Sequence, residues 1–186
     1  MLRIFDFLFS LFGLILGGPA LLVIYVIGLF DTGSPIFRQE RVGRNQKPFT
    51  LVKFRTMRPD TASVASHLAD ASAITPLGAF LRRTKLDELP QLLNVLKGEM
   101  SLVGPRPLLM EYLPLYTSEQ ARRHEVRPGV TGWAQINGCR GEVRTHEEME
   151  QRVNFDLYYI HRWSFTLDLQ IILQTIIKML RDKGAY

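Results

Sequence analysis

The sequence predicts an α+β protein that is mostly helical, with an N-terminal membrane segment and a small β element. Three observations support this class. Residues 7–30 contain no charged side chain, leucines recur at helical spacing over residues 86–96, and residues 48–57 have strand-forming composition within a basic stretch. The chain of 186 residues is long enough for a membrane segment, residues 1–31, and one domain with a real core, residues 32–186.

The composition narrows the classes of partner. The formal net charge is +5, which favours anionic partners such as phosphates, acidic lipids or nucleic acid. We find no nucleic-acid-binding motif and therefore expect no nucleic-acid partner. Cys139 is the single cysteine, so the chain has neither an internal disulfide nor a site that needs several cysteines.

The uncharged N-terminal stretch is long enough to cross a membrane. As a straight helix it would reach roughly 36 Å, against about 30 Å for a hydrocarbon core. Gly18 and Pro19 lie at its middle, where a proline weakens a helix, so the segment is either a kinked transmembrane helix or a re-entrant hairpin. Basic residues that follow, from Arg38 onward, place the remainder on the cytoplasmic side in both cases.

A basic strand follows the membrane segment. Over residues 48–57, period-two alternation puts Lys53 and Arg55 on one face and Val52 and Phe54 on the other. Two cations on one face suit a phosphate or a lipid headgroup, although a solvated strand beside an anionic membrane would look the same. Residues 61–73 are rich in Ala and Ser and are expected to form a loop or a weak helix.

An adjacent acid pair, Asp87 and Glu88, precedes a run of leucines. The spacing predicts one helix over residues 84–98 with the acids in its first turn, where the helix dipole keeps carboxylates ionised and the pKa of Asp87 low. Such a site favours anionic or metal-bound ligands. The alternative is a capping pattern, in which Thr84 and Asp87 only satisfy backbone groups.

Two arginines lie on either side of the acid pair in the sequence. Arg82 comes five residues before Asp87, and Arg106 stands between Pro105 and Pro107. Each proline restricts its neighbour, so the backbone of Arg106 is nearly fixed. This arrangement suits a guanidinium that holds a phosphate, and it also suits a buried arginine that pairs with a carboxylate.

Three segments closely resemble the bacterial sugar transferase family, the monotopic phosphoglycosyl transferases. They are KFRTM at 53–57, LDELPQLLNVLKGEMSLVGPRP at 86–107 and VRPGVTGWAQING at 126–138. The resemblance implies a small catalytic form that moves a sugar-1-phosphate from a UDP-sugar to polyprenyl phosphate and releases UMP. It implies the bacterial inner membrane as the location, with the catalytic domain on the cytoplasmic face and a role early in glycoconjugate assembly.

The resemblance also implies roles for individual residues. Asp87 matches a nucleophile that forms a covalent phosphosugar intermediate and contacts Mg²⁺, and Glu88 matches the acid that assists it. Gly18 and Pro19 match the break of a re-entrant membrane hairpin, where the family usually has Ser-Pro. The expected substrate-binding residues are Lys53, Arg55, Arg82, Arg106, Arg127, Gln135 and Asn137.

Three further segments complete the expected organisation. Residues 118–124 should form a short helix with its basic residues at the surface or at an interface, and residues 142–159 a longer helix that contains Asp156. Asp156 matches an acidic position of the family and could pair with a core arginine. Residues 165–180 should form an apolar helix with a narrow polar stripe, typical of a helix buried in protein or at a membrane interface.

Two other functions fit parts of the sequence. A diphosphate hydrolase would need more carboxylates near Asp87 than Glu88 and Glu99 supply. A basic membrane adaptor would explain the charge but neither the acid pair nor the Pro-Arg-Pro motif. The sequence identifies neither the sugar nor the pathway, and it leaves a homo-oligomer open.

Overall fold

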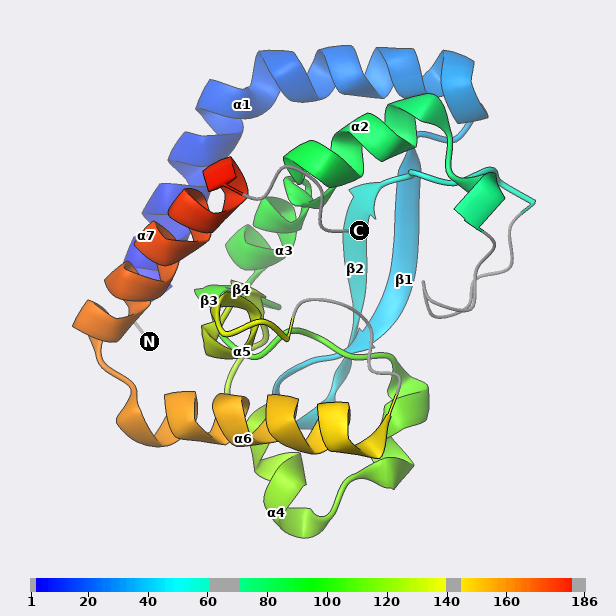
Figure 1. Ribbon diagram of the computed structural model, residues 1–186. Helices are drawn as coiled ribbons and strands as arrows, with labels where there is room; N and C mark the ends of the chain where they lie inside the picture. The colour runs from blue at the N-terminus through cyan, green and yellow to red at the C-terminus, as the bar shows by residue number, and fades with distance from the viewer. Residues whose placement is uncertain (1–2, 61–70, 140–144, 182–186) are drawn as a thin grey trace.

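The computed structural model describes residues 3–60, 71–139 and 145–181. These residues are mostly helical, with two small two-stranded sheets near the centre (Figure 1), which confirms the expected α+β class. The elements follow in this order: α1 (Arg3–Thr32), β1 (Ile36–Val42), η1 (Arg44–Gln46), β2 (Pro48–Phe54), η2 (Ala71–Ala73), α2 (Pro76–Thr84), η3 (Leu86–Glu88), α3 (Gln91–Lys97), β3 (Ser101–Val103), η4 (Met110–Leu115), α4 (Ser118–Ala121), η5 (Arg122–Glu125), β4 (Gly129–Thr131), α5 (Trp133–Ile136), α6 (His146–Arg162) and α7 (Phe165–Arg181).

The two sheets join segments that are near and far in the sequence. β1 and β2 form an antiparallel hairpin in which Phe37 lies opposite Lys53. β3 and β4 pair in parallel, with Ser101 opposite Gly129. Gly129 approaches the neighbouring backbone so closely that a Cβ there would lie 2.1 Å from the Gly104 nitrogen. Parallel pairing therefore brings the 101–107 segment against the loop after residue 126.

One hydrophobic core connects β2, α3, β3, α6 and α7. Its buried members are Phe49, Leu51, Val95, Met100, Leu102, Val103, Ile136, Tyr159 and Ile171. Because α3 contributes Val95 to this core, the acid pair just before α3 is attached to it. Most of the expected loop at 61–73 lies outside the described residues, and only Ala71–Ala73 is seen, as a 3-10 turn.

α1 is one continuous helix of 30 residues that bends sharply part-way along its length (Figure 1). Pro19 lies inside it, and we attribute the bend to this proline because a proline removes one helix hydrogen bond and crowds the preceding turn. The expected break at Gly18 and Pro19 is therefore a bend rather than an interruption. α1 is long and apolar enough to cross a membrane, and only 11% of its most apolar 18-residue stretch is buried against the rest of the protein.

Both ends of α1 contact the rest of the protein. Near its beginning, the Asp6 carboxylate accepts hydrogen bonds from the Ser101 hydroxyl, at 2.5 Å, and from the Leu102 N–H, at 3.1 Å. Near its end, Asp31 accepts a hydrogen bond of 2.7 Å from the Thr75 hydroxyl. The bend thus lets one helix reach the same folded body twice.

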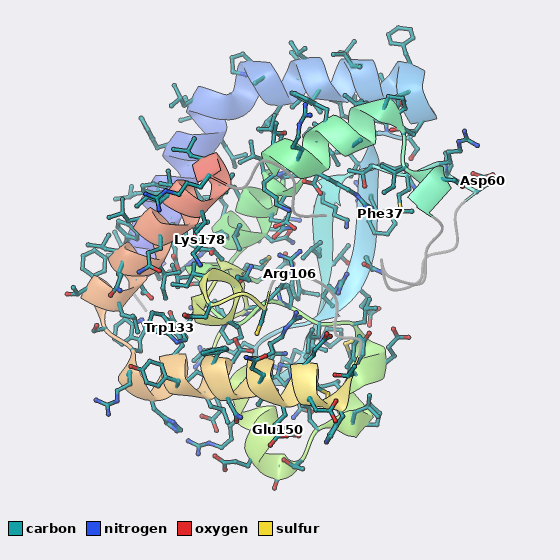
Figure 2. The ribbon with its side chains drawn as sticks, in the orientation of Figure 1. Phe37, Asp60, Arg106, Trp133, Glu150 and Lys178 are labelled. Carbon is teal, nitrogen blue, oxygen red and sulfur yellow. The ribbon has the colours of Figure 1, made fainter. Side chains whose placement is uncertain are left out.

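α7 confirms the expected apolar helix and shows which side of it faces the protein. The Thr175 hydroxyl lies 2.7 Å from that of Thr131, and the Lys178 ammonium donates to the Ile136 carbonyl (Figure 2). Large apolar side chains, among them Leu173 and Leu180, are exposed instead. The side of α7 that faces the protein carries Ile171 together with Thr175 and Lys178, and the opposite side is apolar and exposed. An exposed apolar helix side suits a membrane interface.

Candidate active site

The chain around the acid pair forms two helices rather than the single helix expected over residues 84–98. α2 ends at Thr84, and Lys85 adopts a left-handed conformation with φ 59°. A 3-10 turn, η3, then carries Asp87 and Glu88, and α3 starts only after Pro90. Lys85 interrupts the helical backbone, and Pro90, which has no N–H to donate to the carbonyl of Leu86, weakens α-helical bonding at this point further.

The structure also excludes the expected cap by Thr84. Its hydroxyl donates to the Phe80 carbonyl at 2.9 Å, which places Thr84 in the last turn of α2. The residue that caps a helix here is Thr75, whose side chain accepts from the N–H of Gly78 at 2.9 Å at the start of α2. The cap by Thr84 and Asp87, which was the alternative to a functional role for Asp87, is therefore not formed.

Asp87 is buried and carries an unused acceptor. Its side chain is 6% exposed, and its Oδ1 atom has no hydrogen-bond partner within the described part of the chain. Burial, followed by the negative charge of Glu88, raises the pKa of Asp87 from 3.8 to about 6. The expectation of a low pKa was wrong, because a three-residue 3-10 turn gives little dipole to offset the loss of solvent.

Glu88 has the opposite environment. Its two carboxylate oxygens accept hydrogen bonds from the Arg106 guanidinium at 2.6 and 3.2 Å. Burial by itself raises the pKa of Glu88, but the charge and hydrogen bonds of Arg106 outweigh it and bring the pKa down to about 2. Glu88 therefore stays ionised at neutral pH, and this ion pair fixes Arg106 of the Pro-Arg-Pro motif beside Glu88.

Lys53 on β2 faces the same acids. Burial lowers the pKa of Lys53, and the negative charges of Glu88 and Asp87 act against this effect. Its ammonium lies 5.3 Å from the centre of the Phe37 ring, and the Arg55 guanidinium lies 5.5 Å from the same ring. The predicted shared face of Lys53 and Arg55 is confirmed.

The other expected substrate-binding residues make hydrogen bonds to protein groups outside the acid pair. Arg55 donates to the Ser34 carbonyl at 2.8 Å, and Arg82 donates to the Thr56 hydroxyl at 2.9 Å. Arg127 donates to the carbonyl of Gly98, at the end of α3, at 3.0 Å.

Gln135 and Asn137 make comparable backbone contacts. The Gln135 amide donates to the Val130 carbonyl at 3.1 Å, and that of Asn137 donates to the Trp133 carbonyl at 2.8 Å. The structure thus brings together Asp87, Glu88, Lys53 and Arg106. The substrate roles of Arg55, Arg82, Arg127, Gln135 and Asn137 stay predictions.

Arg123 contradicts the expectation that the basic residues of 118–124 lie at the surface or at an interface, because it is buried in the protein. Its side chain is 1% exposed and donates to the Asp156 carboxylate at 2.6 and 2.9 Å, which confirms that Asp156 pairs with a core arginine. Arg123 also donates to the backbone carbonyl of Arg106 at 3.0 Å. His124 is buried as well. A basic run in a short helix gives no signal for this burial.

Two more arginines near the site were missed. Arg152 on α6 is buried, and burial together with the charges of Arg106 and Arg123 lowers its pKa. Arg41 on β1 is close enough to Lys53 that its charge lowers the pKa of that lysine. Strand alternation places Arg41 on the face of Phe37 and Lys53, which is the signal that could have found it.

The donor set around Asp87 fits a magnesium ion that is shared with a phosphate ligand. The described residues contain no group of three or more His, Cys, Asp or Glu side chains that could hold a metal ion alone. Asp87 offers one oxygen that has no partner among these residues, whereas both oxygens of Glu88 are bonded to Arg106. Mg²⁺ in proteins commonly takes one or two carboxylates and completes its shell with water and substrate phosphates.

A family model described as bacterial sugar transferase matches residues 1–182. The chain belongs to this family. It is 49% identical over 183 residues to "Uncharacterized sugar transferase EpsL" of Bacillus subtilis, an alignment that covers 98% of this chain and 88% of that protein. The sequence-based assignment to the family is therefore confirmed.

Two further relatives have more specific names. The "UDP-glucose:undecaprenyl-phosphate glucose-1-phosphate transferase" of Escherichia coli is 45% identical over 179 residues, which cover 93% of this chain but 39% of that protein. The "Exopolysaccharide production protein PSS" of Rhizobium leguminosarum is 41% identical over 197 residues, 98% of this chain and 96% of that protein. The match thus spans whole relatives of similar size and only part of the larger ones.

Proposed function

We propose that this protein transfers a sugar-1-phosphate from a UDP-sugar to a polyprenyl phosphate and releases UMP. The observation that carries the proposal is the buried Asp87 carboxylate beside the cations Lys53 and Arg106, with one oxygen that no other described residue bonds. The names of the glucose-1-phosphate transferases among its relatives support the same reaction. The reaction would be the first membrane step in assembling a glycoconjugate.

The reaction proceeds through two displacements at one phosphorus atom. An Asp87 oxygen attacks the phosphorus nearer the sugar, the bond from that phosphorus to the oxygen of UMP breaks, and an aspartyl phosphosugar remains. A phosphate oxygen of the polyprenyl phosphate then attacks the same phosphorus and restores the Asp87 carboxylate. Because UMP leaves before the polyprenyl phosphate reacts with the covalent intermediate, ping-pong kinetics follow.

The neighbouring side chains reduce the repulsion between the anionic nucleophile and the anionic diphosphate. Arg106 is 32% exposed, so it can contact a phosphate while its other side stays bonded to Glu88. Lys53 adds a second positive charge on the opposite element, β2. Mg²⁺ bound at Asp87 would neutralise further charge on the diphosphate. Glu88 orients Arg106 through two hydrogen bonds.

We also propose that α1 enters and leaves the membrane by the same face, the cytoplasmic face of the bacterial inner membrane. Contacts of both Asp6 and Asp31 with the folded body support this topology, because a spanning helix would carry one end across the bilayer. Large apolar side chains between the two contacts are exposed. This arrangement would bring the lipid-linked phosphate to the site.

The test is UMP release from a panel of UDP-sugars with polyprenyl phosphate and Mg²⁺, for the wild-type chain and for Asp87→Asn. The control is Asp60→Asn, an exposed acid at the edge of the molecule in Figure 2. We expect turnover by the wild-type and control chains and none by Asp87→Asn. Full turnover by Asp87→Asn would contradict the nucleophile, and no UMP from any sugar would contradict the reaction.

A further inference from the structure

The backbone of the Pro105-Arg106-Pro107 segment is held by bonds from three distant elements. The Gly129 N–H donates to the Pro105 carbonyl at 2.9 Å, and the Val42 N–H donates to the Leu108 carbonyl at 2.9 Å. Between them, the Arg106 carbonyl accepts its bond from a side chain, the guanidinium of Arg123, at 3.0 Å. Arg106 is thus fixed at its side chain by Glu88 and at its backbone by Arg123.

The Arg123 side chain is itself fixed on several sides. Its Nε and Nη2 atoms donate to one oxygen of Asp156 on α6 at 2.9 and 2.6 Å, and the Tyr116 ring lies 5.8 Å from the guanidinium carbon. Both charged side chains are at most 2% exposed. A guanidinium held in this way presents its Nη2 atom to the Arg106 carbonyl with little freedom to turn.

A buried ion pair is a poor means of stabilising a core. Removing two charges from water costs about as much as their attraction returns, and well-packed apolar side chains often do as well. The contact that links this pair to the candidate site is the hydrogen bond to the Arg106 carbonyl. The pair therefore fixes the position of the Arg106 carbonyl through a hydrogen bond, which apolar side chains could not donate.

We propose that Arg123 and Asp156 are positioning residues, which fix the backbone of Arg106 so that its guanidinium meets Glu88 and the phosphate of the substrate. The pair acts through Arg106 and does not itself contact the reacting atoms. The catalytic part of this inference rests on the proposed transfer reaction. The structural part, that the pair restrains residues 104–109, does not.

The test is a double-mutant cycle on kcat/KM for UMP release, with Arg123→Lys made in the wild-type and in the Arg106→Ala background. Lysine keeps the charge next to Asp156 but cannot reach the second acceptor at the same time. We expect a loss of about tenfold in the first background and of less than about twofold in the second. Equal losses in both backgrounds, or no loss in either, would overturn the proposal.

A second measurement does not depend on activity. Amide hydrogen exchange should become faster in peptides that cover residues 104–109 in Arg123→Lys, and it should not in Val153→Ala, which removes buried volume from α6 but leaves both members of the ion pair in place. Unchanged exchange in Arg123→Lys would overturn the proposal. A wild-type chain that releases no UMP would instead contradict the transfer reaction, and hydrogen exchange would still decide the positioning role.

Asp156→Asn serves where Arg123→Lys does not fold. It keeps the shape of the partner while removing its charge, and we expect the same dependence on Arg106 in the cycle and the same faster exchange. Melting curves in detergent identify folded variants. Failure of both variants to fold would show that the pair is needed for the core itself and would overturn the positioning role.

Discussion

Asp87 and Glu88 are adjacent acids whose surroundings push their pKa values in opposite directions. Glu88 is paired with Arg106 and has a pKa of about 2, whereas burial beside Glu88 raises the pKa of Asp87 to about 6. Two neighbouring acids whose pKa values are shifted in opposite directions are typical of a functional site. The ionised form of Asp87 is poorly solvated, which favours its reaction with an electrophile or its binding to a metal ion.

The raised pKa predicts that Asp87→Asn stabilises the metal-free protein. A carboxyl that binds its proton more tightly in the folded chain costs stability once it ionises. For a pKa raised from 3.8 to about 6, this cost in the free energy of unfolding is at most about 3 kcal/mol. The cost is fully present above pH 6 and disappears as pH falls through 6 toward 4. We therefore expect Asp87→Asn to melt at a higher temperature than wild type at pH 7.5, with a difference that shrinks by pH 5.

The comparison is made in detergent with a chelator and without substrate, since bound Mg²⁺ would stabilise the ionised form. Asp60→Asn is the control, because Asp60 is exposed and should leave the melting temperature unchanged. A lower melting temperature for Asp87→Asn at pH 7.5 would contradict the assigned burial of an ionised, weakly partnered carboxylate.

Residue types were easier to predict than residue environments. The sequence predicted that Asp87, Glu88, Lys53 and Arg106 would serve one site, and the structure brings them together. It did not predict the pKa of Asp87, because solvent loss depends on the packing of β2 and the 101–107 segment around η3. Nor did it predict that Arg123 is buried, because its partner Asp156 lies 33 residues away.

The first turn of α1 is attached to the element that follows the acid pair. Asp6 accepts from the Ser101 hydroxyl and the Leu102 N–H on β3, and Arg3 donates to the carbonyls of Val95 and Leu96 at the end of α3. α1 therefore helps to hold the end of α3 opposite the acid pair, in addition to any contact with lipid.

Asp6→Ala is expected to destabilise the protein, because it removes the acceptor of two buried hydrogen bonds, from the Ser101 hydroxyl and the Leu102 N–H. A buried donor that loses its acceptor costs about 1–3 kcal/mol. Asp6→Asn keeps one acceptor oxygen and should lose less. The measurement is chemical denaturation in detergent, followed by circular dichroism.

Ser10→Ala is the matched control in the same helix. Ser10 is fully buried and its hydroxyl has no hydrogen-bond partner within the described residues, so its removal should cost little. Equal stability of Asp6→Ala and Ser10→Ala would contradict the contribution assigned to the Asp6 contacts.

Element type followed from the sequence, and element ends did not. Apolar spacing predicted α7 and the body of α6, and alternation predicted β2 with its two faces. The expected helix over residues 84–98 divides because Lys85 adopts a left-handed conformation and Pro90 lacks an N–H, which spacing alone does not reveal. The bend of α1 keeps helical structure through Pro19, where the sequence allowed either a kink or a break.

At the scale of the whole molecule, the bent α1 and the exposed apolar side of α7 are the features that suit a membrane. Both ends of α1 return to one folded body (Figure 1). These contacts support the proposal that α1 enters and leaves the membrane by the same face.

This topology predicts that both ends of α1 react from the same side of the membrane. Single cysteines replace the exposed Ile4 and Arg38 in a Cys139→Ser chain, and sealed vesicles of known orientation are treated with an impermeant maleimide. We expect both to be labelled from the cytoplasmic face, with detergent-solubilised protein as the control for reactivity. Labelling from opposite faces would show a spanning helix.

The central claim is that Asp87 carries the sugar phosphate between the two substrates. The most direct measurement is mass spectrometry of the protein after incubation with an accepted UDP-sugar and Mg²⁺ in the absence of polyprenyl phosphate. We predict release of up to one UMP per protein and a sugar-phosphate adduct on the peptide that contains Asp87, which polyprenyl phosphate then removes. UMP release only when polyprenyl phosphate is present, with no adduct on Asp87, would contradict the account.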